Sequence, residues 1–245
     1  MTCTYVITGA SRGLGFEFIK QVSAQGHTVI SLARNPDASE NLQKLVDSKK
    51  VFAFKLDVLN KESIKLQKKK LIYTHVNEAA SEGIDCLINN AGIIGDRECD
   101  ILNTPGEEYL EVFNTNVVAV SNITQAFLPL LRKRGQERPK KVLNISSLLG
   151  SISSFSPWRP DCTDATYLVS KCALDMLTKI FSNKLACENF IVYAANPGWV
   201  KTDMGGEEAP IEACDSISDM LKVFDNVSAE QSGALIDSDG QIISW

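Results

Sequence analysis

The sequence predicts a single α/β domain built on a Rossmann-type, doubly wound parallel β-sheet with helices on both faces. Short β-branched or apolar runs alternate with longer segments of helical length and period along the whole chain. Parallel strands need long crossovers, and right-handed crossovers place helices on both faces of one sheet. Because no linker rich in Pro, Gly or Ser divides the 245 residues, we expect one domain spanning residues 1–245.

Seven short runs have the length and the composition of strands. We expect these strands at Tyr5–Thr8, Thr28–Leu32, Val51–Leu56, Cys86–Ile88, Lys141–Ile145, Ile191–Ala194 and Ala234–Asp237. The stretches between them predict helices at Leu14–Ala24, Ala38–Val46, Glu62–Ala80, Tyr109–Arg132 and Tyr167–Ala186. Ligands of such sheets bind at the carboxyl ends of the strands, where the chain places Gly9, Asn35, Asp57, Asn89, Ser147 and Pro197.

The turn after the first predicted strand carries glycines at positions 9, 13 and 15. Between a strand and a helix, backbone N–H groups at the start of the helix can bind a pyrophosphate. A tight turn alone would also favour glycine. Three glycines together with Thr8 and Ser11 favour a phosphate site, with the cofactor-binding residues Gly9, Ser11, Arg12, Gly13, Leu14 and Gly15.

The same residues, from Gly9 to Gly13, also match the G-x-S-x-G pattern of a serine hydrolase. That fold needs a histidine far downstream of its serine. No histidine follows His75, and the pattern would occupy the first strand of the sheet. We therefore set the hydrolase hypothesis aside.

About twenty residues past the glycine turn, NAD-dependent enzymes place an acidic residue on the ribose 2′-hydroxyl. This chain reads Ser31-Leu32-Ala33-Arg34-Asn35 there, so the acid is missing and a guanidinium stands nearby. Arg34 can pair with a 2′-phosphate, and Arg12 is a second candidate cation. The pattern favours NADP(H) over NAD(H), while the alternative that Arg34 is an ordinary surface arginine stays open.

Tyr167 and Lys171 are four residues apart in a predicted helix and therefore share one face. An ammonium beside a phenol favours the phenolate and should lower the pKa of Tyr167 from its ordinary value of about 10. This pair is a candidate for proton transfer to a substrate.

The composition is that of a soluble globular protein, with 44% hydrophobic and 22% charged residues. The net charge of −5 argues against nucleic-acid binding, and the basic run Lys65–Lys70 is typical of the solvated face of a helix. With His27 and His75 as the only histidines, we expect no metal site. The N-terminus shows no signal or membrane-spanning segment and the seven cysteines show no paired spacing, so we expect a cytoplasmic protein with free thiols and no membrane partner.

In their order along the chain, these motifs resemble the short-chain dehydrogenase/reductase family. The resemblance rests on the Thr8–Gly15 turn, Asn89-Asn90-Ala91-Gly92, Ser147, the Tyr-x-x-x-Lys pair and Asn196-Pro197-Gly198. It runs essentially from end to end. The stretch from Pro197 to Gly206 and the ending with Asp239-Gly240 and Trp245 are similar to the sniffer-type carbonyl reductases of that family.

The resemblance implies a role for each matching residue. Tyr167 is the implied general acid/base, Lys171 lowers its pKa and holds the nicotinamide ribose, and Ser147 polarises the substrate carbonyl. Ser147 is preferred over Ser146 because it aligns with the second serine of the family's pair, and strand alternation lets only one of them face the site. Asn116 resembles the helix asparagine that holds a water for proton relay. The implied further cofactor contacts are Asp57, Val58, Asn89, Ala91, Gly92, Tyr167, Pro197, Gly198, Val200 and Thr202.

The expected activity is NADPH-dependent reduction of small ketones, aldehydes or quinones, with a small-molecule carbonyl or alcohol as substrate. The alternative is a catalytically silent dinucleotide-binding sensor or scaffold, against which the intact set of Ser147, Tyr167, Lys171 and Asn116 speaks. The helices Tyr109–Arg132 and Tyr167–Ala186 resemble the pair that builds oligomer interfaces in the family, which implies a homodimer or homotetramer.

Two segments beside the substrate are also predicted from the sequence. The insert between Ser147 and Tyr167 either shapes the pocket through Phe155 and Trp158 or is a surface loop without a role. The segment after Met204, including the run 207–219, is expected to be mobile and to close over the substrate as a lid.

Overall fold

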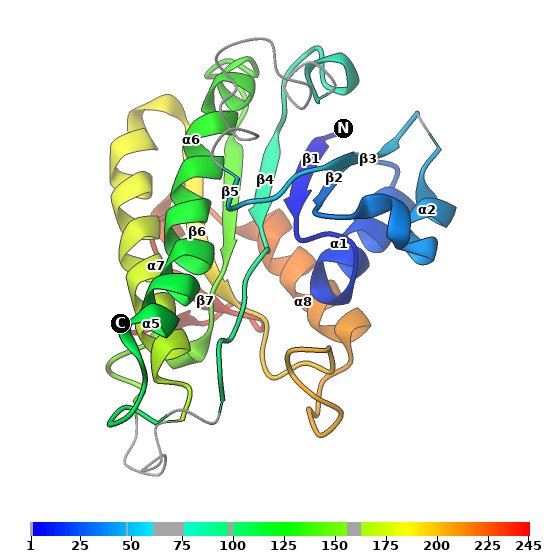
Figure 1. Cartoon of the computed structure of the whole chain (residues 1–245). Coiled ribbons are helices and arrows are strands. Elements are labelled where there is room, and N and C mark those ends of the chain that lie inside the picture. Colours follow the sequence, from blue (N-terminus) through cyan, green and yellow to red (C-terminus); the bar gives the residue numbers. More distant parts are fainter. Residues whose placement is uncertain (1, 48, 61–75, 98–99, 156–162) are drawn as a thin grey trace.

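The computed structural model describes residues 2–47, 49–60, 76–97, 100–155 and 163–245. Its centre is one eight-stranded sheet with the strand order β3-β2-β1-β4-β5-β6-β7-β8 (Figure 1). All neighbouring pairs are parallel except β7 and β8, which are antiparallel. The order reverses between β1 and β4, and in sheets of this kind ligands bind at such a switch point.

All seven predicted strands are present, each within two residues of its predicted ends. They are β1 (Thr4–Thr8), β2 (Thr28–Ala33), β3 (Val51–Lys55), β4 (Cys86–Asn89), β5 (Lys140–Ile145), β6 (Phe190–Asn196) and β7 (Leu235–Asp237). The eighth strand, β8 (Ile242–Ile243), is two residues long and was not predicted from the sequence. The predicted doubly wound fold is confirmed.

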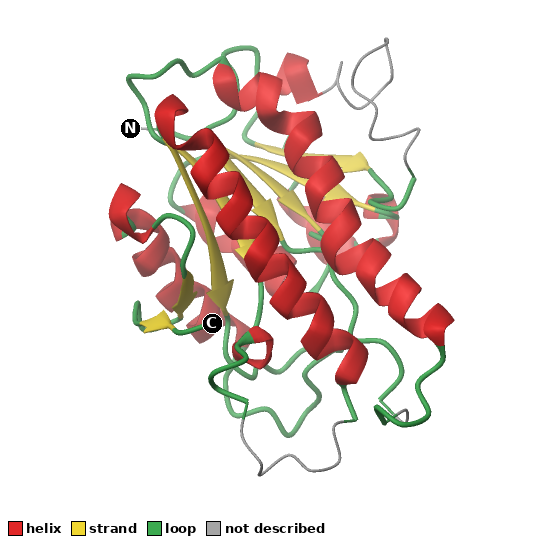
Figure 2. Ribbon diagram, turned by 90° about the vertical axis from the view of Figure 1, so that its left-hand side faces the viewer, coloured by secondary structure: helices red, strands yellow, loops and turns green. Residues whose placement is uncertain are grey.

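Helices cover both faces of the sheet (Figure 2). On one face, apolar side chains of α1 (Gly13–Ala24), α2 (Glu40–Leu45) and α8 (Ala213–Asn226) pack against the sheet. On the other face lie α5 (Gly106–Phe113), the π-helical turn η2 (Asn114–Val118), α6 (Ala119–Arg132) and α7 (Ala165–Leu185). Val6 points into the second cluster while its neighbours Tyr5 and Ile7 point into the first, as strand alternation requires.

The predicted helices are found with some changes at their boundaries. The prediction Tyr109–Arg132 corresponds to α5, η2 and α6, so the helix starts three residues earlier and widens into a π-turn in its middle. The predicted helix Ala38–Val46 divides into the 3-10 turn Pro36–Ala38 and α2. Of the predicted helix Glu62–Ala80, residues 76–79 are helical, and the remainder up to position 75 lies outside the described residues, together with the basic run Lys65–Lys70.

The predicted mobile run 207–219 was wrong in its second half. Helix α8 begins at Ala213, and its side chains Ile217, Met220, Leu221 and Phe224 are buried against the sheet and α1. The apolar positions recur every three or four residues, which is the spacing of one helix face. Only the stretch between Gly205 and Glu212 is left as a candidate lid.

Candidate functional site

The glycine turn joins β1 to α1 at the carboxyl edge of the sheet. Gly9 and Gly13 have positive φ values of 65° and 54°, which side chains with a Cβ rarely adopt. A Cβ on Gly15 would lie 2.4 Å from the Gly9 carbonyl oxygen, so only glycine lets the helix approach the turn this closely. Because Arg12 at the N-cap makes no side-chain cap, the first N–H groups of α1 are available to a phosphate. The turn therefore fits the dinucleotide phosphate predicted for it.

The loop after β4 is tied to this turn by direct hydrogen bonds. Thr8 Oγ1 accepts from the backbone N–H groups of Asn90 and Ala91 at 3.1 and 3.2 Å. Asn90 Nδ2 donates to the carbonyl oxygens of Thr8 and Gly9 at 2.9 and 3.1 Å. The glycine turn and the Asn89–Gly92 stretch thus form one rigid wall of the crevice.

Asn89 itself points away from the crevice. Its side chain is buried, and Nδ2 donates to Thr124 Oγ1 at 3.0 Å and to Asn144 Oδ1 at 2.8 Å. Asn144 Nδ2 donates in turn to Thr178 Oγ1 at 2.8 Å. This buried chain of polar groups links α6 and β4 to β5, which ends before Ser147, and to α7, which carries Tyr167 and Lys171. Any contact of Asn89 with a cofactor would therefore come from its backbone.

The helix α7 carries Tyr167 and Lys171 one turn apart, as their spacing predicted. Lys171 Nζ lies 5.3 Å from the centroid of the Tyr167 ring and donates to the Ile145 carbonyl oxygen at 2.7 Å. The Ile145 residue ends β5 directly before Ser146 and Ser147. The lysine therefore connects the tyrosine helix to the strand that carries the serine.

Burial governs the ionisation of both groups. It raises the pKa of Tyr167 to about 12, although the Ser147 hydroxyl and the Arg97 guanidinium lower it. Burial lowers the pKa of Lys171 to about 8, and the Asp175 carboxylate raises it. The expected lowering of the Tyr167 pKa below 10 was wrong, because removal of the phenolate from water outweighs the Ser147 hydrogen bond and the Arg97 charge. A phenol of this kind is protonated at neutral pH and ready to donate its proton.

Ser147 is partly exposed at the end of β5, while Ser146 is buried. A side-chain hydrogen bond with Ser147 lowers the pKa of Tyr167, so the two hydroxyl groups lie within reach of each other. The Ser147 Oγ also accepts from the Leu149 N–H at 3.1 Å, which fixes its position at the start of a short 3-10 turn. The structure thus brings the predicted serine and tyrosine hydroxyls together.

Asn116 occupies the middle of the π-helical turn and is fully buried. Its Oδ1 accepts from the Ile93 N–H at 2.9 Å, and its Nδ2 donates to the Ile93 carbonyl at 2.8 Å and to Ser170 Oγ at 3.0 Å. Ser170 Oγ also donates to the Tyr167 carbonyl at 2.7 Å. Asn116 therefore holds the loop after β4 against the tyrosine helix, and π-turns are frequent at functional sites.

The far side of the crevice is formed by residues that follow β6. Gly198 has a φ of 79°, and Val200 pairs with Ile211 in an isolated bridge. Thr202 Cγ2 would lie 3.5 Å from a Cβ placed on Gly13. The Pro197–Thr202 segment is thereby brought next to the glycine turn, from which it is far removed in sequence.

The two arginines predicted to bind a 2′-phosphate differ in their surroundings. Arg34 is exposed directly after β2. Arg12 forms an ion pair with Asp203 at 3.1 Å, and about three quarters of each side chain is exposed. Exposed pairs of this kind contribute little to stability, so a phosphate can compete for Arg12 at small cost. Asp57 and Val58 follow β3 at the same edge, and Asp57 Oδ1 accepts from the Leu59 N–H at 3.0 Å.

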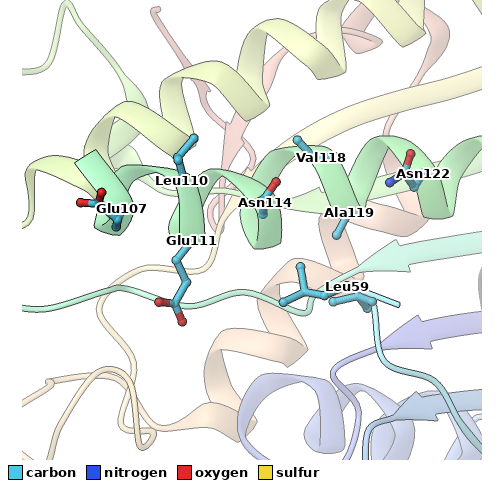
Figure 3. A pocket seen from close by; sticks show the side chains of 9 residues that line it. Leu59, Glu107, Leu110, Glu111, Asn114, Val118, Ala119 and Asn122 are labelled. Carbon is cyan, nitrogen blue, oxygen red and sulfur yellow. The ribbon is translucent and has the colours of Figure 1, made fainter. Parts of the chain in front are cut away.

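A hollow of about 580 Å³ lies beside α5 and α6 (Figure 3). Of the predicted site residues only Val58 lines it, so this hollow is separate from the catalytic groups. Its walls combine apolar, amide and carboxylate side chains: Val58, Leu59, Glu107, Leu110, Glu111, Asn114, Val118, Ala119 and Asn122.

Several residues around the site were not predicted from the sequence. Ser170 and Arg97 act on Tyr167, and Asp175 acts on Lys171. Their contacts join elements far apart in the chain, which no local pattern reveals. Of the predicted insert residues, Phe155 is about half exposed on the loop after Ser147, and Trp158 lies outside the described residues.

No group of three or more His, Cys, Asp or Glu in the described part of the chain could hold a metal ion. Among residues 2–47, 49–60, 76–97, 100–155 and 163–245, no helix has the length and apolar character needed to span a membrane.

This chain is similar in sequence and in structure to known proteins. A family model for short chain dehydrogenases matches residues 4–212. An uncharacterized oxidoreductase of Schizosaccharomyces pombe is 34% identical over 266 residues, covering 98% of this chain and 97% of that protein. NADPH-bound carbonyl reductase from chicken fatty liver matches with a TM-score of 0.90 and 34% identity, over 100% of this chain and 99% of that one. Carbonyl reductase Sniffer of D. melanogaster matches over 100% of both chains, with a TM-score of 0.90 and 27% identity.

Proposed function

This chain belongs to the short-chain dehydrogenase family, and on that premise we propose that it reduces small ketones, aldehydes or quinones with NADPH. The observation that carries the proposal is the convergence of Ser147, Tyr167 and Lys171 at the carboxyl edge of the sheet, beside a glycine turn fitted to a dinucleotide. Similarity to carbonyl reductases supports the substrate class.

In the proposed reaction, the hydroxyls of Ser147 and Tyr167 hydrogen-bond to the carbonyl oxygen of the substrate. When bound, the reduced nicotinamide supplies a hydride, and thus two electrons, to the carbonyl carbon. Negative charge grows on the oxygen as the C=O double bond is lost, so the two donors stabilise the transition state more than the ground state. The Tyr167 O–H bond breaks and its proton completes the alcohol. The Lys171 ammonium beside the ring then stabilises the phenolate until it is reprotonated.

The preference for NADPH rests on the end of β2. Arg34 stands exposed there, and the stretch 31–35 has no carboxylate that could hold a free ribose 2′-hydroxyl. Arg12 adds a second cation that is held by Asp203 at the surface. A 2′-phosphate can accept several charge-assisted hydrogen bonds from guanidinium groups.

We infer that the protein works in the cytoplasm. Five cysteines among the described residues are free thiols: Cys3, Cys86, Cys172, Cys187 and Cys214. Unpaired cysteines are typical of proteins in reducing compartments. No nucleic acid or membrane partner is needed for the proposed reaction.

We infer further that two copies associate through α5, η2 and α7. These elements lie side by side on one face of the molecule (Figure 1) and expose large apolar side chains: Leu110, Val118, Val169, Met176 and Ile180. Leu110 and Val118 also line the hollow beside α5 and α6 (Figure 3), which could receive side chains of a second copy. Large apolar side chains exposed on neighbouring helices often mark a protein interface.

Light scattering should therefore give twice or four times the chain mass of 26.8 kDa. Changing both Met176 and Ile180 to Glu should reduce the mass to that of one chain, because each carboxylate would be buried in the interface without a partner. Changing Ile242, which is exposed on β8, to Glu is the control and should keep the wild-type mass. A wild-type protein with the mass of one chain would exclude this association.

The function itself is tested by following the loss of reduced-nicotinamide absorbance with NADPH and with NADH. The panel should contain ketones, aldehydes, quinones and dicarbonyls. We expect oxidation that requires a carbonyl substrate and is faster with NADPH. If NADPH binds but no member of the panel is reduced, the silent sensor or scaffold becomes the better hypothesis.

A further inference from the structure

A buried carboxyl group lies directly behind the catalytic residues. Asp175 is one turn after Lys171 on α7, on the same face of the helix, and is 1% exposed. Neither carboxyl oxygen has a hydrogen-bond partner in the described part of the chain. A carboxyl group buried in this way is costly, because both oxygens lose their contacts with water.

The surroundings of Asp175 are built around its carboxyl group. A Cβ on Gly150 would lie 2.6 Å from Asp175 Oδ2. The absence of a side chain at Gly150, three residues after Ser147, therefore makes room for the Asp175 carboxyl group. Ser146 is also fully buried, and its hydroxyl has no partner at hydrogen-bonding geometry among the described residues. This hydroxyl is nevertheless close enough to Asp175 to lower the pKa of the carboxyl.

Few other charged groups act on Asp175 and Lys171. On α7, Tyr167 and Cys172 are the neighbouring titratable groups, and burial, followed by the charge of Asp175 as a smaller cause, raises the pKa of both. Arg97 after β4 and Asp164 before α7 act on Tyr167, whereas Asp175 is the charged group that acts on Lys171. Burial raises the pKa of Asp175 to about 7 and lowers that of Lys171 to about 8. Burial thus works against the charged form of both groups, and the charge of each favours ionisation of the other.

We propose that Asp175 is a positioning residue of the active site, whose buried carboxylate, held by the Ser146 hydroxyl, is the counter-charge that keeps Lys171 protonated. This inference rests on the proposed reductase function, since it assigns a cause to the charge that Lys171 brings to Tyr167. Ser146 and Ser147 then have separate roles. The first holds the acid behind the site, and the second faces the substrate.

Asp175→Asn is the decisive variant, because it removes the charge and keeps the shape. The titration of Lys171 can be followed by NMR through its Cε resonance, assigned with Lys171→Arg, and this readout needs no turnover. We expect the midpoint to fall by about one pH unit or more, which is tenfold in the proton-binding equilibrium. Asp164→Asn is the matched control, since the Asp164 charge acts on Tyr167, and it should leave the Lys171 midpoint unchanged.

The kinetic readout is the dependence of kcat/KM on pH. In Asp175→Asn, the fall of activity at alkaline pH should move to lower pH by the same amount as the Lys171 midpoint. A purely structural role for Asp175 would lower activity evenly at every pH and leave the Lys171 titration in place, and that result would overturn the proposal. If Asp175→Asn does not fold, Ser146→Ala should shift the same midpoint downward by a smaller amount, and an unshifted midpoint would again overturn it.

The two hypotheses fail in different ways. If the wild-type protein reduces no carbonyl compound but Asp175→Asn shifts the Lys171 midpoint, the proposed function is lost and the pairing of Asp175 with Lys171 stands. If turnover is normal and the midpoint does not move, the reverse holds.

Discussion

Tyr167→Phe should lower carbonyl-dependent NADPH oxidation by about 100- to 10,000-fold, the usual contribution of a positioned general acid. The variant removes the proton that completes the alcohol, as well as one of two donors to the carbonyl oxygen. NADPH affinity, measured by fluorescence titration, should change little, because the glycine turn and the Asn89–Gly92 wall do not involve the phenol hydroxyl.

Tyr109→Phe is the matched control for this result. Tyr109 lies on α5, is partly exposed, and loses the same hydroxyl without touching the reacting groups. It should retain full turnover. Tyr167→Phe turnover close to that of the wild type would remove Tyr167 from the proposed mechanism.

Arg34→Glu should raise the KM for NADPH by about ten- to a hundredfold, while the KM for NADH changes by less than about threefold. A charge-assisted hydrogen bond contributes about 1.5–3 kcal/mol, and the new carboxylate also repels the 2′-phosphate. A carboxylate at this position can instead accept from a free 2′-hydroxyl, which favours NADH. Steady-state kinetics with both coenzymes and one carbonyl substrate measures the change.

Lys44→Glu reverses the same charge on the exposed surface of the neighbouring helix α2. Comparing Lys44→Glu with Arg34→Glu distinguishes the loss of a direct contact with the phosphate from a general change in the electrostatic field. We expect the Lys44 variant to leave both KM values close to wild type. Equal increases for NADPH and NADH in Arg34→Glu would mean that Arg34 is an ordinary surface arginine.

The fold was largely predictable because its strands are buried on both sides. Runs such as Tyr5–Thr8 and Ile191–Ala194 are continuously apolar or β-branched, and the connections between parallel strands must be long. The helix α8 was missed because its first turn is polar, with Asp215 and Ser216, although Ile217, Met220, Leu221 and Phe224 carried a helical spacing. The strand β8 carries no such signal, since it has two residues and pairs only with β7.

The candidate site was predictable as a set of residues and less so as chemistry. Resemblance to the family, now supported by the match of residues 4–212, directed attention to Ser147, Tyr167 and Lys171. The direction of the Tyr167 pKa could not be obtained from the Tyr-x-x-x-Lys spacing, because it depends on burial, which the tertiary packing decides. The same holds for Asp175, which comes near Ser146 and Gly150 only when β5 and α7 are packed together.

A crystal structure of the protein with NADP⁺ and an alcohol product would test the proposed site. We expect Tyr167 Oη and Ser147 Oγ both to lie at hydrogen-bonding distance, about 2.6–3.2 Å, from the alcohol oxygen. We also expect the pyrophosphate to lie on the first N–H groups of α1. An alcohol oxygen bound away from these two hydroxyls, with the nicotinamide ring in place, would contradict the proposed site.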